Sequence, residues 1–139
     1  MKCQICGRSI TNPDSVRFGI GPKCRVKLQE TVLLTAKTGG KHSGYLRQFE
    51  AMSDTSLARS IRSYLREIQI HQEKLQNPEP FLKRQSWSQM SNLQRSGLIR
   101  HWEKEIRKFQ ELALLAIAEL QRRKLSHVDR ANHSSRMDS

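Results

Sequence analysis

The sequence predicts a mainly α-helical protein, in which a small N-terminal cysteine knuckle with a short β-hairpin precedes an antiparallel helical hairpin or small bundle. Three observations predict this fold class. All three cysteines lie within the first 24 residues. Two later segments repeat apolar residues at alternating spacings of four and three, the pattern of helices that pack along a seam. A turn with two prolines separates these segments, so we expect the helices to run antiparallel.

The cysteine spacing indicates a metal site. Two residues separate Cys3 from Cys6, and Gly7 follows them, so two thiolates can hold one ion above a tight backbone turn. Cys24 falls in the first turn of a helix that is expected to begin at Pro22. The helix dipole favours a thiolate at that position.

Short strands are expected between the two parts of this site. Residues 8–11 and 15–18 have strand-like patterns, and the turn-forming sequence Asn-Pro-Asp lies between them. Knuckle, hairpin and ligand-bearing helix, in this order, are typical of a treble-clef zinc site. The sequence therefore predicts one bound Zn²⁺, which would stabilise the N-terminal module.

The fourth ligand is less clearly marked, because structural zinc sites are almost always four-coordinate and the chain has three cysteines. His42 is too far along the chain if the first helix is straight. Asp14, in the expected hairpin turn, is the favoured candidate. Other donors would have to arrive through tertiary structure, from a partner's side chain or from His71, His101 or His127. The alternatives to a zinc site are three unligated thiols or a redox-active Cys-x-x-Cys pair.

The same residues resemble a known module. The matching segments are Cys-x-x-Cys-Gly-Arg at residues 3–8, Thr-Asn-Pro-Asp-Ser at 11–15 and Gly-Ile-Gly-Pro-x-Cys at 19–24. Together they look like a small zinc-knuckle or treble-clef-like cysteine module of uncharacterised function that recurs in phage, plasmid and bacterial proteins. The resemblance covers about residues 2–28. It implies a bound zinc and assigns no activity.

Helical patterns fill the rest of the chain. The first helix is expected over residues 22–37, where a Gly-Gly hinge follows, and residues 45–52 are expected to add two turns. A longer helix, capped by Ser53 or Asp54, should run to about Gln76. Its apolar seam consists of Leu57, Ile61, Tyr64, Ile68, His71 and Leu75.

The last long helix is expected from near Ser91 to near Lys124. Its seam consists of Ile99, Trp102, Ile106, Phe109, Ala113, Ala116 and Leu120. Leu112, Leu115 and Ile117 widen the apolar stripe, so this helix should be buried on more than one side. The first helix, a second copy in a homodimer, or another partner would cover the additional face.

These elements divide the chain into a zinc-binding module with its first helix at residues 1–40, a helical hairpin or bundle at 41–125, and a polar tail at 126–139. Residues 81–90 should bridge the two long helices as a short helix or ordered loop. His71, at a seam position, is expected to be a half-buried histidine with a hydrogen bond.

Composition limits the class of protein. The chain has 139 residues, 36% of them hydrophobic, and a formal net charge of +12. Such a charge favours a polyanionic partner, nucleic acid first among them. The longest apolar run, residues 112–118, is too short to span a bilayer, and the N-terminus has no signal-peptide pattern. We therefore expect a cytoplasmic protein that does not enter membranes.

The charge is concentrated in two segments. Residues 1–40 hold seven Lys and Arg against two acids, a net +5, and residues 77–100 hold four against one, a net +3. Elsewhere both signs mix at the spacing of intrahelical ion pairs. The predicted contact residues for nucleic acid or a partner are Arg8, Arg17, Lys23, Arg25 and Lys27 in the first segment, and Lys83, Arg84 and Trp87 in the second.

These observations favour binding over catalysis. The sequence shows no Gly-rich phosphate loop, nucleophile elbow or pair of carboxylates, so we expect no enzyme and no small-molecule substrate. The first hypothesis is a small basic zinc-binding accessory protein that binds nucleic acid or a nucleoprotein complex. The alternative is a phage- or plasmid-type inhibitor, similar to anti-CRISPR proteins, that docks on a host defence nucleoprotein machine through protein–protein contacts of its helical hairpin.

Overall fold

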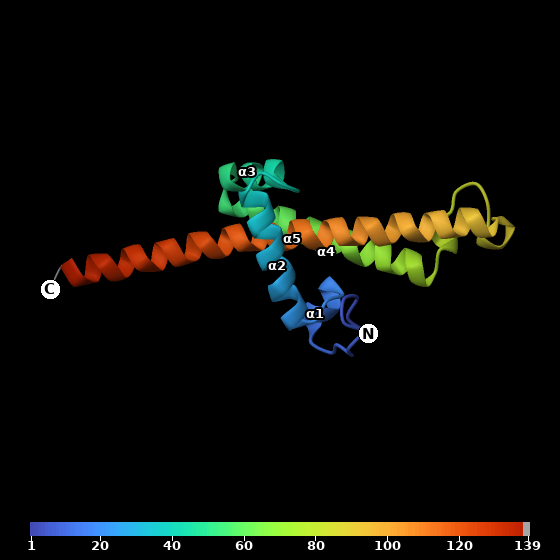
Figure 1. The fold of residues 1–139 in the computed structure, drawn as a ribbon, viewed down its shortest axis with the longest axis horizontal. Helices are drawn as coiled ribbons and strands as arrows, with labels where there is room; N and C mark the ends of the chain where they lie inside the picture. The colour runs from blue at the N-terminus through green and yellow to red at the C-terminus, as the bar shows by residue number, and fades with distance from the viewer. Residues whose placement is uncertain (138–139) are drawn as a thin grey trace.

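The computed structural model describes the backbone of residues 1–137 and the side chains of residues 1–125. It is built from helices joined by short connections (Figure 1). The helices are α1 (Pro13–Phe18), α2 (Pro22–Lys37), α3 (Ser43–Ala51), α4 (Asp54–Gln76), the 3-10 helices η1 (Glu79–Phe81) and η2 (Trp87–Gln89), and α5 (Asn92–Met137). The predicted mainly α-helical fold class is confirmed. The side chains of the expected polar tail, residues 126–139, lie outside the described part of the chain.

Helices α4 and α5 form the antiparallel hairpin that their seams predict, and they lie side by side along the long axis of the molecule (Figure 1). Leu57 and Ile68 of α4 and Ile106 of α5 are at most 1% exposed. The seam histidine, His71, is buried, and its Nδ1 atom lies 2.7 Å from the carbonyl oxygen of Glu67. The expected hydrogen-bonded histidine is therefore present, and it is more deeply buried than predicted.

The wide apolar stripe of α5 is covered within the chain. Helix α2 crosses α5, and α3 packs against it as well (Figure 1). Leu112 and Leu115 of α5 are buried in the same hydrophobic core as Val32 and Ala36 of α2 and Leu46 of α3. This face of α5 therefore does not need a second copy to cover it, and the homodimer stays a prediction.

The predicted β-hairpin is wrong. Residues 15–18, expected as the second strand, belong to helix α1. In place of the first strand, predicted over residues 8–11, the described residues contain one isolated antiparallel bridge, between Lys2 and Ser9.

Local helix signals explain why α1 replaces the second strand. The Asn12 side-chain oxygen accepts a hydrogen bond from the Asp14 N–H at 2.9 Å, and Pro13 occupies the first helical position. Both are strong helix-start features. Gly19 ends the helix in the left-handed region, with φ 73°. The turn chemistry of this segment therefore encodes the start of a helix rather than the loop of a hairpin.

The predicted starts of the long helices are confirmed. The Ser53 hydroxyl caps α4, and Ser91 and Gln94 exchange backbone-to-side-chain hydrogen bonds at the start of α5. Helix α5 continues beyond the predicted end at Lys124. Despite this length, no helix in the described residues has a stretch long and apolar enough to cross a membrane.

One buried side chain fastens the N-terminal residues to the hairpin. Gln110 of α5 is 1% exposed, and its amide donates to the Phe18 carbonyl oxygen at 2.7 Å and to the Gln4 side-chain oxygen at 2.9 Å. The apolar residues of the N-terminal segment that join the same hydrophobic core are Cys3, Ile10, Phe18 and Ile20. The core is therefore continuous from the cysteine segment to the hairpin.

The position of Leu115 gives a test of this packing. Leu115 is fully buried where α2 crosses α5, so Leu115→Ala should lower the free energy of unfolding by about 2–5 kcal/mol. The matched control is Leu93→Ala, also on α5 but 77% exposed, which should change it by less than about 0.5 kcal/mol. Urea denaturation followed by circular dichroism measures both. Equal effects of the two substitutions would contradict the packing described.

Candidate metal centre

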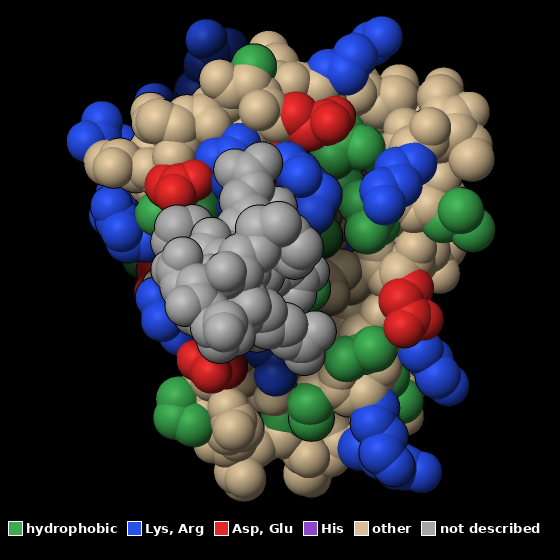
Figure 2. All heavy atoms as spheres, turned by 90° about the vertical axis from the view of Figure 1, so that its left-hand side faces the viewer, with side chains coloured by type: hydrophobic (Ala, Val, Ile, Leu, Met, Phe, Trp, Pro, Cys, Tyr) green, Lys and Arg blue, Asp and Glu red, His purple; other side chains and the backbone are tan. Residues whose placement is uncertain are grey.

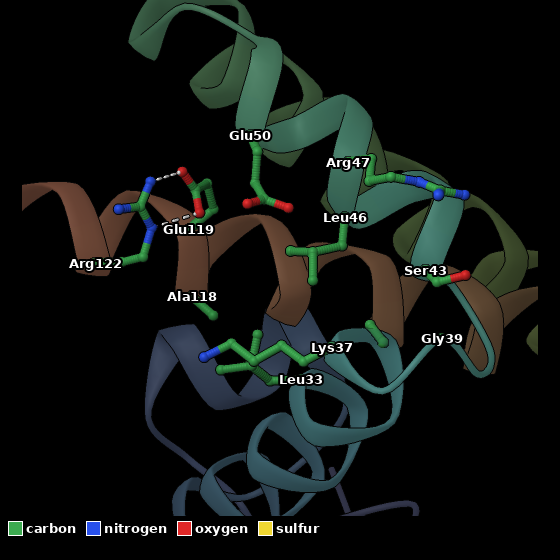
Figure 3. Close-up of a pocket in the computed structure, with 11 residues that line it drawn as sticks. Leu33, Lys37, Gly39, Ser43, Leu46, Arg47, Glu50, Ala118, Glu119 and Arg122 are labelled. Atoms are coloured by element: carbon green, nitrogen blue, oxygen red, sulfur yellow. Dashed lines mark hydrogen bonds and ion pairs between the residues drawn. The ribbon is translucent and has the colours of Figure 1, made fainter.

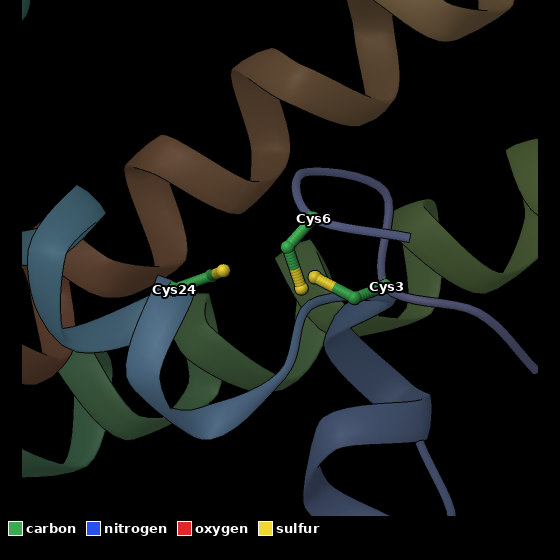
Figure 4. A group of neighbouring side chains, drawn as sticks. All are labelled: Cys3, Cys6 and Cys24. Carbon is green, nitrogen blue, oxygen red and sulfur yellow. The ribbon is translucent and has the colours of Figure 1, made fainter. Parts of the chain in front are cut away.

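Cysteines from two separate segments meet in space (Figure 4). Cys3 and Cys6 come from the N-terminal turn, and Cys24 comes from the first turn of α2. Their sulfur atoms all lie within 4.8 Å of one another and face a common centre (Figure 4). Thiolates bound to one Zn²⁺ at about 2.3 Å stand about 3.8 Å apart in a tetrahedral site. A small closing movement therefore suffices for this cluster to hold a metal ion.

A tight turn presents the first two sulfur atoms. The Gly7 N–H donates to the Cys3 carbonyl oxygen at 2.9 Å, and the Cys3 N–H donates to the Arg8 carbonyl oxygen at 2.8 Å. Gly7 has a φ of 75°, which a residue with a Cβ atom adopts at a cost. This is the backbone turn that the Cys-x-x-Cys-Gly pattern predicts.

The start of α2 supplies a further contact that the sequence analysis missed. Gly21 caps this helix without a side-chain hydrogen bond, and its N–H donates to the Cys3 sulfur at 3.3 Å. The available signal was the Gly-Pro pair directly before the helix. A cap without a side chain leaves the first amide groups of a helix open to another acceptor, and here the acceptor is a cysteine.

The thiols of the cluster differ in their tendency to ionise. Burial opposes ionisation of Cys3, but the backbone N–H groups of Cys6, Gly21 and Ile5 outweigh it and lower the pKa of this thiol to about 6. The contact with Cys6, together with burial and the nearby Cys3, raises the pKa of Cys24 to about 11. Thiolates this close repel one another, so the last one ionises readily only beside a cation.

The described residues place no fourth side-chain donor in this cluster. Asp14, the expected fourth ligand, is exposed in the first turn of α1 and does not join the sulfur atoms. His42 and His71 form hydrogen bonds elsewhere in the fold, and His101 is exposed on α5. The side chain of His127 lies outside the described residues.

The sulfur atoms border a surface pocket of about 470 Å³. Cys6 is exposed and Cys24 is half-buried. The other lining residues are Arg8, Ser9, Ile10, Gly21, Pro22, Lys23 and Lys27. None of these side chains is a carboxylate or an imidazole, and three of them carry a positive charge.

Most of the predicted contact residues of the module are exposed cations. They are Arg8, Arg17, Lys23 and Lys27. The ion pairs found among the described residues involve other cations. Arg25 differs, because its guanidinium donates to the Ser15 hydroxyl at 3.1 Å and lies 5.4 Å from the ring centroid of Phe18. Arg25 therefore ties α2 to α1 within the module.

The second predicted patch lies at the closed end of the α4–α5 hairpin, away from the N-terminal module (Figure 1). Lys83 and Arg84 are exposed there. Trp87 is half-buried and stacks on Trp102, with ring centroids 6.3 Å apart and planes 19° from parallel. One face of Trp87 is thus occupied within the fold, which reduces the surface it can offer to a base.

A second hollow, of about 500 Å³, lies between α2, α3 and α5 (Figure 3). Leu33, Leu46 and Ala118 form its apolar side. Its buried carboxylate, Glu119, accepts hydrogen bonds from Arg122, which hold the pKa of this carboxyl below its ordinary value against partial burial. Since that charge is compensated within the fold, the cysteine cluster is the stronger candidate site.

Comparison with known proteins finds a match, and it covers the segment that contains the cysteine cluster. Residues 1–29 match a family of unknown function, DUF6011, and this segment contains all three cysteines. No curated protein and no solved structure matches the chain. The expected occurrence of the module in phage and plasmid proteins stays a prediction.

The cluster predicts a specific metal content. Protein purified without chelator should contain about one zinc per chain, and Cys24→Ser should lose most of it, because two thiolates cannot hold a structural zinc tightly. Asp14→Asn is the matched control and should keep the metal, since Asp14 lies outside the cluster. Elemental analysis of the three proteins measures this. Wild-type protein that folds fully without any metal would contradict the site.

Proposed function

We propose that this chain is a small, non-enzymatic zinc-binding protein whose basic N-terminal module binds nucleic acid or a nucleoprotein complex. The observation that carries the proposal is the exposed group of cations beside the cysteine cluster. Arg8, Lys23 and Lys27 line the same pocket as the three sulfur atoms. A metal that fixes the turn and the start of α2 also fixes the positions of these charges.

Zinc is the metal that fits the donor set. Thiolates are soft ligands that select zinc among the common divalent ions, whereas magnesium and calcium take oxygen ligands. Cys3, Cys6 and Cys24 would hold the ion, and its role would be to hold the module together. The residues that line the pocket include no carboxylate or imidazole to act as a general base. This supports a binding role rather than a catalytic one.

Charge supports a polyanionic partner. Lys and Arg side chains stand out around the outline of the molecule when it is viewed from the C-terminal end of α5 (Figure 2). Phosphate contacts from such side chains give affinity without sequence specificity. Among the described residues, the ion pairs involve cations outside the module, so the charges of its exposed cations are not compensated at short range.

The salt dependence of binding tests the proposal. The affinity of the protein for DNA or RNA should fall linearly on a log–log plot against salt concentration, with a slope of about −0.9 per neutralised phosphate on a duplex. The double variant Lys23→Ala/Lys27→Ala should make that slope less steep by about 1.8, because two contacts are lost. Fluorescence anisotropy with labelled duplex and single-stranded oligonucleotides measures the slopes.

The matched control is Lys104→Ala/Lys124→Ala, which removes two exposed lysines of α5 outside the module. Its slope should equal that of the wild type. Equal slopes for all three proteins, or no binding at about 50 mM salt, would refute a nucleic-acid role for the module. A pull-down with and without nuclease then tests the alternative, in which the protein docks on a host nucleoprotein machine through protein contacts.

A further inference from the structure

We propose that the metal held by Cys3, Cys6 and Cys24 takes its fourth ligand from outside the chain, and that this ligand is a thiolate carried by an acidic molecule. This inference rests on the zinc site proposed above and adds the chemical class of an exogenous ligand to it. The juxtaposition that supports it is a three-thiol cluster on an open pocket lined by cations.

The first step concerns coordination. Zinc bound by three thiolates keeps one tetrahedral position, and structural zinc is almost always four-coordinate. Apart from the cysteines, the side chains that line the pocket within the described part of the chain end in cationic, hydroxyl or aliphatic groups. None of these is a usual zinc ligand. Since Cys6 is exposed and the pocket is open to the surface, a donor from another molecule can reach the metal.

The second step concerns charge. One divalent cation and three thiolates carry a net charge of −1. Arg8, Lys23 and Lys27 place three positive charges on the same pocket, and no carboxylate lines it. The metal and its surroundings together are therefore positive, so electrostatic complementarity favours an anionic ligand that bears further acidic groups.

The third step concerns the donor atom. Sulfur, imidazole nitrogen and carboxylate oxygen all bind zinc. Of these donors, the thiolate is both anionic, as the charge favours, and of the soft type that the other three ligands already provide. The incoming thiol gives its proton to solvent when it binds. The sequence has three cysteines, all in the cluster, so a second copy could supply a thiolate only by giving up a ligand of its own. The ligand is therefore a small acidic thiol or a cysteine in an acidic peptide segment.

Cobalt(II) in place of zinc tests the proposal, because its visible absorption reports how many thiolates bind it. The full chain, loaded with one equivalent of cobalt in a thiol-free reductant, is titrated with mercaptosuccinate, 2-mercaptoethanol or succinate. We expect mercaptosuccinate to convert a three-thiolate spectrum into a four-thiolate spectrum. The neutral thiol should do so at higher concentration, and succinate should leave the spectrum unchanged.

A second arm distinguishes the two sources of the thiol. An acidic peptide with one cysteine is compared with mercaptosuccinate, and its serine counterpart serves as the control. Tighter binding of the cysteine peptide assigns the position to a protein segment. Tighter binding of mercaptosuccinate assigns it to a small molecule. Either result supports an exogenous thiolate, provided that the serine peptide does not change the spectrum.

The role of the cations is tested with the variant Lys23→Ala/Lys27→Ala. Each lost charge should weaken mercaptosuccinate binding about threefold, whereas binding of 2-mercaptoethanol and of cobalt should stay the same. Lys104→Ala/Lys124→Ala should behave as the wild type. Two results would overturn the proposal. One is a cobalt spectrum that already shows a fourth protein donor, sulfur or imidazole nitrogen, before any thiol is added. The other is a three-thiolate spectrum that millimolar thiols leave unchanged. A chain that binds no cobalt would instead refute the metal site itself.

Discussion

The N-terminal end of the molecule is organised around three thiol groups within 4.8 Å of one another. Such groups cannot all ionise in one place unless a cation compensates their charge. The surrounding backbone is already arranged to favour charge on sulfur, because the Gly21 N–H points at Cys3 and the turn at Gly7 brings Cys6 close. Four apolar side chains of this segment, Cys3, Ile10, Phe18 and Ile20, are buried in the core. A metal bound by the three thiolates would add folding free energy to this packing.

The cysteine segment is also held in a fixed position on the hairpin. The buried amide of Gln110 fixes it there by donating hydrogen bonds to the Phe18 carbonyl oxygen and the Gln4 side-chain oxygen. Gln4 lies between two of the cysteines, and its backbone N–H also donates to the Gly19 carbonyl oxygen at 2.9 Å. One side chain of α5 thus contacts both the cysteine turn and the end of α1. A movement of the cysteine turn would therefore alter the hydrogen bonds of Gln110, which is buried in the hairpin.

Features with strong local signals were predictable from the sequence, and features that depend on distant contacts were not. The Ser53 cap and the seam of α4 are local, so the bounds of that helix were predicted closely. The strand predicted at residues 15–18 was wrong because Asn12 and Pro13 start a helix there, and this start determines the local structure more strongly than a short alternating pattern. The internal role of Arg25 depends on Ser15 and Phe18, which reach it only after α1 packs on α2. The spacing of the cysteines predicted that they would group together. It did not predict the position of Asp14, because α1 holds this residue outside the cluster.

The molecule uses its positive charge in two different ways. On α5 the buried carboxylate of Glu111 is bound by Lys41 and Arg107, each at 3.1 Å, and Glu119 is bound by two arginines in the same manner. A cation held in such a pair retains little attraction for an outside anion, because its charge is compensated at short range. The exposed cations of the module have no ion pair of this kind among the described residues, and three of them border the cysteine pocket. Exposed cations elsewhere, such as Lys83, Arg84 and Lys104, form no such pair either. The module differs from them because its cations lie together beside the three thiols. Gln110 of the hairpin holds the module in place, and the module brings three cations together at one pocket.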